Sequence, residues 1–198
     1  PHLSTATFSL VVGDVNTFDP FGPDNYGYYC FDNTDTSYRF HPEFRWIDVN
    51  IAWTYVTLSD DDVETVDLPF AVQYYGQTFD EVTICDNGYI AFGRTWWPNF
   101  LNTPIPSPQC APAMVAPFWD DFVMTPGRVY YHYAASPDSG MFIIGWRNAY
   151  DDDVSRNQTF EIVILDGALW PTVTGDNEIV FQYQTAQGVT SMGAGICS

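Results

Sequence analysis

The sequence predicts an all-β fold, an antiparallel β-sandwich of jelly-roll type with ten to twelve strands and no substantial helix. Aromatic residues make up 18% of the chain, and these residues favour the half-buried surfaces of sheets. Short β-branched or aromatic runs alternate with clusters of Gly, Pro, Asn and Asp along the whole chain. No segment of ten or more residues has helical periodicity, so the strands are expected to form the core by themselves.

The clearest local signal is a hairpin. Residues 81–85 (EVTIC) and 89–92 (YIAF) are two β-rich runs joined by Asp86-Asn87-Gly88. Asn and Gly accept the positive φ angles of a tight turn, so the two runs are expected to pair directly.

The other expected strands follow the same pattern on both sides of this hairpin. They cover residues 4–12, 46–53, 63–68, 70–74, 114–118, 128–133, 141–147, 159–165, 178–184 and 192–196. Pro69 separates two of them and should lie at a sheet edge or a bulge, because proline cannot donate to a ladder. Residues 94–112 contain five prolines and predict a long ordered loop.

The first strand is set apart from the others. In residues 4–12 (STATFSLVV) every second side chain is apolar, which places Ala6, Phe8, Leu10 and Val12 on one face. A breaker-rich lead follows, so we divide the chain into residues 1–20, the strand and its lead, and residues 21–198, a single sandwich domain. The strand could pair within its own domain or add to a neighbouring copy as a donor strand.

The charge balance excludes several partners. The chain has 25 acidic residues against six arginines, no lysine, and a net charge of −19. Such a surface repels phosphate backbones and anionic lipids, so no nucleic-acid partner is expected. No apolar run of 18 residues occurs, so no membrane insertion is expected.

The four cysteines, Cys30, Cys85, Cys110 and Cys197, lie far apart without metal-site spacing. An even number in an aromatic-rich β chain predicts two disulfides and an oxidising, extracellular compartment, with three pairings open. Because the chain opens at Pro1 without a signal peptide, we expect a trimmed mature form.

Catalytic patterns are weak. Three histidines are present but no GxSxG elbow, and the cysteines are better explained as disulfides. Glu161 and Glu178 lie on expected strands and could share an open sheet face as a glycosidase pair, although exposed glutamates on strands are common. The sequence therefore predicts no enzymatic activity and no cofactor, and leaves a calcium ion possible.

Two kinds of binding site remain open. Tyr89, Trp96 and Trp97 could hold a glycan by ring stacking, or could cap the core under the long loop. Calcium could bind if acidic strand ends converge, although solvated turns explain each cluster as well. The acidic candidates are Asp60, Asp61, Asp62, Asp120, Asp121, Asp151, Asp152 and Asp153. Asn157 begins a glycosylation sequon on an expected loop.

The order of motifs resembles a known type of domain. The motifs are LPFAVQYYGQTFDEVTICDNGYIAFG, PIPSP, APFWDDF, GRVYYHY, FIIGWRNAY, QTFEIVIL and NEIVFQYQ, within residues 24–196. Their succession is similar to a β-domain of large secreted bacterial proteins, where it accompanies peptidase or sorting modules, and more distantly to the extracellular nidogen-type (NIDO-like) domain. The resemblance implies an extracellular, non-catalytic module and supplies no catalytic residues.

These observations favour an extracellular, cell-surface structural or adhesive protein whose partners are copies of itself. Sheet edges are usually guarded by lysine, which this chain lacks, so a neighbour's strand could add and form a pilus-like filament. The alternative is a monomeric module that binds surface glycans or adheres through calcium, and a glycosidase is a distant third.

Overall fold

The computed structural model describes residues 19–124, 128–135, 140–150, 156–187 and 193–196. Contacts divide the chain into two compact units, residues 1–44 and 45–198. All the strands described below belong to the second unit, so residues 21–44 lie outside the unit that forms the sandwich. The expected strand 4–12, with Ala6, Phe8, Leu10 and Val12, lies outside the described residues.

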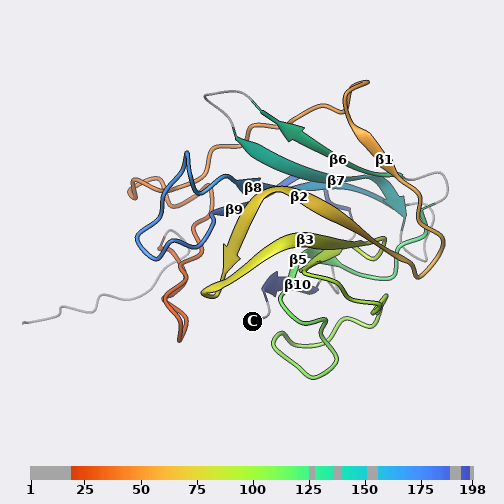
Figure 1. Ribbon diagram of the computed structural model, residues 1–198, viewed down its shortest axis with the longest axis horizontal. Helices are drawn as coiled ribbons and strands as arrows, with labels where there is room; N and C mark the ends of the chain where they lie inside the picture. The colour runs from red at the N-terminus through yellow and green to blue at the C-terminus, as the bar shows by residue number, and fades with distance from the viewer. Residues whose placement is uncertain (1–18, 125–127, 136–139, 151–155, 188–192, 197–198) are drawn as a thin grey trace, which may run out of the picture. The chain divides into compact units, whose positions relative to one another are not determined.

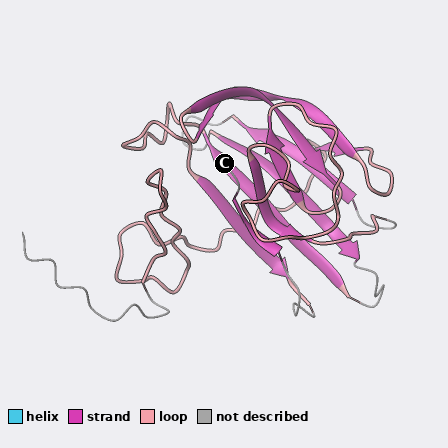
Figure 2. Cartoon of the chain, turned by 90° about the horizontal axis from the view of Figure 1, so that it is seen from below, coloured by secondary structure: helices cyan, strands magenta, loops and turns pink. Residues whose placement is uncertain are grey.

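The second unit is a sandwich of two antiparallel five-stranded sheets (Figures 1 and 2). The strands are β1 (Thr54–Val56), β2 (Val63–Tyr74), β3 (Gln77–Cys85), β4 (Tyr89–Phe92), β5 (Met114–Trp119), β6 (Arg128–Ala134), β7 (Met141–Tyr150), β8 (Asn157–Leu165), β9 (Ile179–Thr185) and β10 (Gly193–Ile196). No helix occurs among the described residues, which confirms the all-β prediction. Those residues accordingly contain no helix that could cross a membrane.

The strand order differs from the expected jelly roll. One sheet has the order β1-β6-β7-β8-β9 and the other β10-β5-β4-β3-β2. Strands β6 to β9 and strands β2 to β5 each follow one another as neighbours, so both sheets are built mainly as meanders. The jelly-roll prediction is wrong for the described strands, because the successive strands β2 to β5 and β6 to β9 stay neighbours within one sheet each.

The core between the sheets is rich in stacked aromatic rings. Phe160 of β8 lies 5.0 Å from the ring of Trp146 and 5.5 Å from that of Phe118 in the opposite sheet. All three side chains are buried. Because large aromatic side chains bury extensive apolar surface, this group contributes strongly to the stability of the sandwich.

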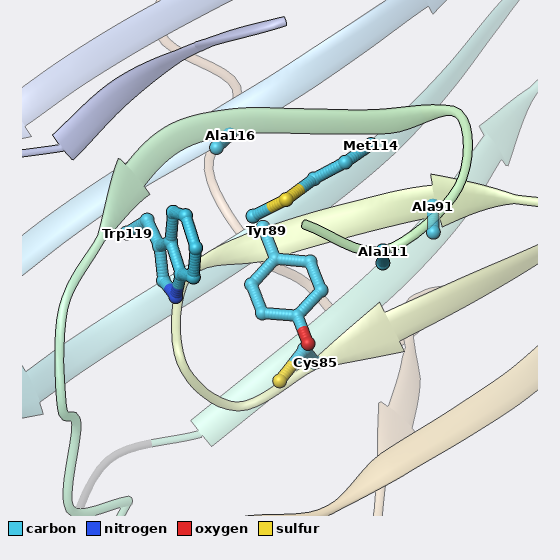
Figure 3. Close-up of a cluster of buried hydrophobic side chains, with 7 residues drawn as sticks. All are labelled: Cys85, Tyr89, Ala91, Ala111, Met114, Ala116 and Trp119. Atoms are coloured by element: carbon cyan, nitrogen blue, oxygen red, sulfur yellow. The ribbon is translucent and has the colours of Figure 1, made fainter. Parts of the chain in front are cut away.

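Each sheet also has an apolar cluster on its outer face, covered by a segment without strands. The loop of residues 94–112 covers a cluster that includes Cys85, Tyr89 and Trp119 (Figure 3). On the other sheet, residues 45–53 cover a cluster around Ile143 and Val163.

The expected strand at 46–53 is therefore wrong. This segment forms no ladder, although Ile47, Val49 and Trp53 pack on the outer cluster. Its alternation of apolar and polar residues reflects one-sided burial over a sheet face, which gives the same sequence pattern as a strand.

Two turn predictions are confirmed in outline. Pro69 lies in β2, an outer strand, and the register of β2 against β3 shifts between Asp67 and Val72. The hairpin of β3 and β4 turns through Asp86–Gly88, where Gly88 has a φ of 78°. A left-handed φ favours glycine, so this residue is required by the turn.

The first unit has no named strand among its described residues. Phe21 and Cys30 form an antiparallel bridge through two backbone hydrogen bonds of 2.9 and 2.8 Å. The Asp24 carboxylate accepts backbone N–H groups in the turn between them, from Tyr26, Gly27 and Tyr28. Local side-chain bonds of this kind stabilise turns without a large core.

Candidate functional site

The outer strands of the sandwich are the surfaces on which a further strand could pair. In the part of the chain that the structure describes, these are β1 and β9 in one sheet and β10 and β2 in the other. Strand β1 has three residues and β10 has four. Strands this short offer few backbone groups to a partner, which is one way in which proteins protect sheet edges.

The two longer outer strands differ in chemistry. Strand β2 has the exposed residues Glu64, Asp67 and Pro69, and its register is shifted. Charges, proline and bulges all discourage edge pairing. Strand β9 (IVFQYQT) has neither a charged residue nor a proline over seven residues. Among the described edges, β9 is therefore the long strand without charge or proline, although its register against β8 shifts between Tyr183 and Thr185.

The second candidate surface is an aromatic one on the loop of residues 94–112. Trp96 is 77% exposed, Trp97 48% and Leu101 63%. Large apolar side chains exposed together on one loop are typical of binding surfaces. Two of the three predicted glycan residues, Trp96 and Trp97, therefore present open ring surface.

The third predicted glycan residue, Tyr89, does not. Its ring is buried in the outer cluster (Figure 3). Its hydroxyl donates to the carbonyl of Trp97 and accepts the N–H of Asn99 at 3.2 Å. Tyr89 therefore anchors the loop from below, and burial raises the pKa of its phenol.

Further hydrogen bonds hold this loop in one conformation. The indole N–H of Trp119 donates to the carbonyl of Asn99 at 2.8 Å, and the indole N–H of Trp97 donates to the carbonyl of Gln109 at 3.1 Å. Asn102 donates to the carbonyl of Trp119 at 3.0 Å. A loop fixed in this way presents its exposed rings at little entropic cost to binding.

The turn between β3 and β4 gathers residues of two acidic clusters. The amide of Asn87 donates to Asp61 at 2.9 Å, and the backbone N–H of Asp62 donates to the Asp86 carboxylate at 3.1 Å. The N–H of Asp120 donates to the carbonyl of Asn87 at 3.3 Å. Within the described ranges, however, no three His, Cys, Asp or Glu side chains are placed to hold a metal ion. Asp151, Asp152 and Asp153 lie outside those ranges.

Asp86 is the buried member of this turn. One of its oxygens, Oδ2, is buried without a hydrogen-bond partner among the described residues. Burial, with a smaller contribution from Asp61, raises the pKa of Asp86 to about 7. The folded protein therefore holds a proton on Asp86 at pH values at which the unfolded chain has released it.

Asp86→Asn should change the pH dependence of stability. The contribution of Asp86 to the free energy of unfolding falls as pH rises between about 4 and about 7, because the unfolded state loses this proton first. Asparagine keeps an oxygen acceptor for Asp62 but does not titrate, so the slope should flatten by up to about 1.4 kcal/mol per pH unit. Urea denaturation of both proteins across this range measures the slope. An unchanged slope would contradict the assignment of the raised pKa to Asp86.

The predicted carboxylate pair does not form. Glu161 is buried, and its carboxylate binds Arg147 at 2.9 Å, the amide of Gln182 at 3.0 Å and the N–H of Ile47 at 3.2 Å. Glu178 is exposed and precedes β9, four residues before the partner of Glu161. The expected open face shared by the two glutamates is wrong, because residues 45–53 cover Glu161.

Arg147 completes this network. Its guanidinium also donates to the carbonyl of Ile47 at 3.0 Å and lies 4.2 Å from the ring centre of Trp46. Burial raises the pKa of Glu161, while the Arg147 charge acts in the opposite direction. These contacts attach the covering segment to the sheet and explain both charges as structural.

Two further predictions are corrected. Cys30, Cys85 and Cys110 are free thiols in the described structure, so the expected disulfide framework is not found among them, and Cys197 lies outside the described residues. Cys85 is buried next to Asp86, and burial strongly raises the pKa of its thiol.

Asn157 is the first residue of β8 and pairs with Tyr150, so its sequon does not lie on a loop.

The structure reveals candidate positions that the pattern of residues does not indicate. The open edge at β9 depends on strand order, and the sequence shows only that residues 179–185 form a strand. The contact between Arg147 and Glu161 could likewise not be predicted from the sequence and became visible only in the structure. The alternation in residues 46–53 was the available signal for their burial over a sheet.

Comparison with known proteins gives one match. The family model described as "NIDO related" matches residues 31–197, which is most of the chain. Neither the curated proteins nor the solved structures contain a match. The matched range includes all ten strands and both candidate surfaces.

Proposed function

The chain belongs to the NIDO-related family, and from this premise we propose that it is an extracellular, non-catalytic structural or adhesive protein. In the sharpest form of the proposal it is a filament subunit. Each copy donates its N-terminal strand, residues 4–12, to a sheet edge of the next copy. The observation that carries the proposal is the long, uncharged edge of β9 in a chain without lysine.

The physical basis is strand addition. A donor strand satisfies backbone N–H and C=O groups at the edge, and its alternating side chains enter successive apolar positions. In the proposed contact the donor (residues 4–12) and the acceptor edge come from different stretches of the chain, so the contact is heterologous. Heterologous contacts that do not close into a ring generate open filaments.

Changing the donor strand tests the proposal. The full chain with Phe8→Asp and Leu10→Asp should lose filament formation, because two carboxylates would have to enter an apolar site. Negative-stain electron microscopy of this variant beside the native chain gives the readout. The matched control is Thr5→Asp with Ser9→Asp, which adds the same charge to the opposite face of the strand and should disturb assembly less.

Filaments of equal length and number from the Phe8→Asp/Leu10→Asp variant would exclude the donor strand. Monomers from the native chain would instead favour the second candidate function, a monomeric glycan-binding module. The exposed Trp96 and Trp97 on their anchored loop support that alternative. Retention on immobilised glycans should then depend on these two rings.

A further inference from the structure

Along the edge of β9, the side chains that face the core are only partly buried. Its residues Ile179, Phe181 and Tyr183 lie opposite the core residues of β8 and share their face of the sheet. The β8 partners are Ile164, Ile162 and Phe160, and all three are fully buried. The three β9 side chains are only partly buried. The apolar interior is thus incompletely covered along this edge.

Hydrogen bonds to the opposite sheet lie at the two ends of this partly buried edge. At one end Asn177 donates its N–H to the carbonyl of Gln73 in β2 at 2.8 Å and accepts the N–H of Gln73 at 2.7 Å. At the other end the hydroxyl of Tyr183 donates to the carbonyl of Pro117 in β5 at 2.6 Å. Ile179 and Phe181 lie between these two attachments. We call the stretch from Asn177 to Tyr183 the β9 slot.

The geometry points to the β9 slot as the acceptor site for residues 4–12 of a neighbouring copy. This inference rests on the proposed function and specifies its acceptor. The donor segment lies outside the described residues and supplies alternating apolar side chains of the required kind. Phe8 and Leu10 would enter beside Phe181 and Ile179, so the donor would complete the core of its partner as well as extend the sheet.

Length and charge support this occupant. The slot covers seven residues, about 20 Å of strand, and the apolar set from Ala6 to Val12 also covers seven. Residues 179–185 and the donor strand carry no charge although the chain has a net charge of −19, so Glu178, at one end of the slot, is the one acidic residue in the proposed contact. The exposed Glu64 and Asp67 make the edge of β2 a poorer acceptor.

The test uses two full-length variants: one cannot donate its strand, and the other cannot accept a strand. The donor-defective chain is the Phe8→Asp/Leu10→Asp variant. The acceptor-defective chain has Phe181→Lys and Gln184→Lys, which place charge on the β9 edge. Gln184 is exposed and has no register partner in β8, so a lysine fits there without disturbing the ladder. The matched control is Ala71→Lys, at an exposed position of the β2 edge.

Neither defective chain should form filaments alone, whereas Ala71→Lys should assemble as the native chain does. An equimolar mixture of the two defective chains should give heterodimers of twice the 22.4 kDa chain mass, because one intact donor meets one intact acceptor. Light scattering measures this mass. Filaments from the acceptor-defective chain, with none from the donor-defective chain, would show that the β9 slot is not the acceptor. They would leave the proposed function intact. Filaments from both would overturn the proposed function itself.

Hydrogen exchange provides a readout that does not depend on the folding of the acceptor-defective chain. In native filaments, compared with donor-defective monomers, amides of residues 179–185 should gain protection while those of residues 63–67 should not. Unchanged exchange in residues 179–185 would contradict the assignment of the β9 slot as the acceptor. A monomeric native chain with these amides protected would mean that the strand fills the slot of its own chain, which overturns exchange between copies.

Discussion

Replacing Arg147 with methionine is expected to lower the free energy of unfolding by about 3–5 kcal/mol at neutral pH. The substitution would leave Glu161 buried and uncompensated, because Arg147 contacts its carboxylate at 2.9 Å. It would also remove the guanidinium bond to Ile47 and the contact with the ring of Trp46. Urea denaturation followed by tryptophan fluorescence measures the change.

Arg94→Met is the matched control. Arg94 pairs with Glu81 at 2.5 Å, but both side chains are far more exposed than those of Arg147 and Glu161, so the loss should be much smaller. Adding Glu161→Gln to Arg147→Met should recover part of the stability, because the buried charge is then absent. Equal losses from Arg147→Met and Arg94→Met would contradict a structural role for the buried pair.

Gly88→Ala is expected to lower the free energy of unfolding by about 2–5 kcal/mol. A Cβ atom at Gly88 would lie 1.8 Å from the carbonyl oxygen of Phe118 and 2.8 Å from the ring of Phe122. The φ of 78° adds strain for any L side chain. Backbone cannot move away as a flexible side chain can, so the turn itself must shift.

Gly93→Ala separates the strain of a positive φ from the steric clash of the added Cβ atom. Gly93 has a similar φ of 81°, but a Cβ there would meet only the ring of Phe79, at 3.4 Å. Its cost should therefore be about 1–2 kcal/mol, the conformational term alone. Thermal and urea denaturation of the two variants give the comparison. If Gly88→Ala cost no more than Gly93→Ala, the close approach of Phe118 would not be important for stability.

The sequence predicted those parts of the fold that depend on local chemistry. The Asn87-Gly88 pair identified the central hairpin, and the prolines of residues 94–112 identified the long loop. Turn residues and strand-forming runs act over a few positions, so their consequences can be inferred without the tertiary structure.

The remaining features depend on contacts between distant segments. Residues 46–53 alternate as a strand does, but they cover a sheet face that is formed by residues about 100 positions later. The alternation along its strand predicts that Glu161 is exposed, but the covering segment buries it. Whether a strand is an outer one is set by the order of strands in the sheet, which explains why β9 could be predicted as a strand but not as an edge.

The candidate surfaces show the same division. Trp96 and Trp97 were correctly expected on the long loop, because proline density predicts irregular structure and exposed loops carry binding residues. Tyr89 was grouped with them from its nearness in sequence, yet strand alternation turns it into the outer cluster. The free Cys85 and Cys110 show that an even number of cysteines does not by itself establish a disulfide framework.

The most direct test of self-assembly is the mass of the native full-length chain, measured by light scattering over a series of concentrations. Strand exchange between copies predicts a mean mass that rises with concentration beyond small multiples of 22.4 kDa, because each added copy presents a new acceptor. A mass that stays at that of one chain at every concentration would contradict the account.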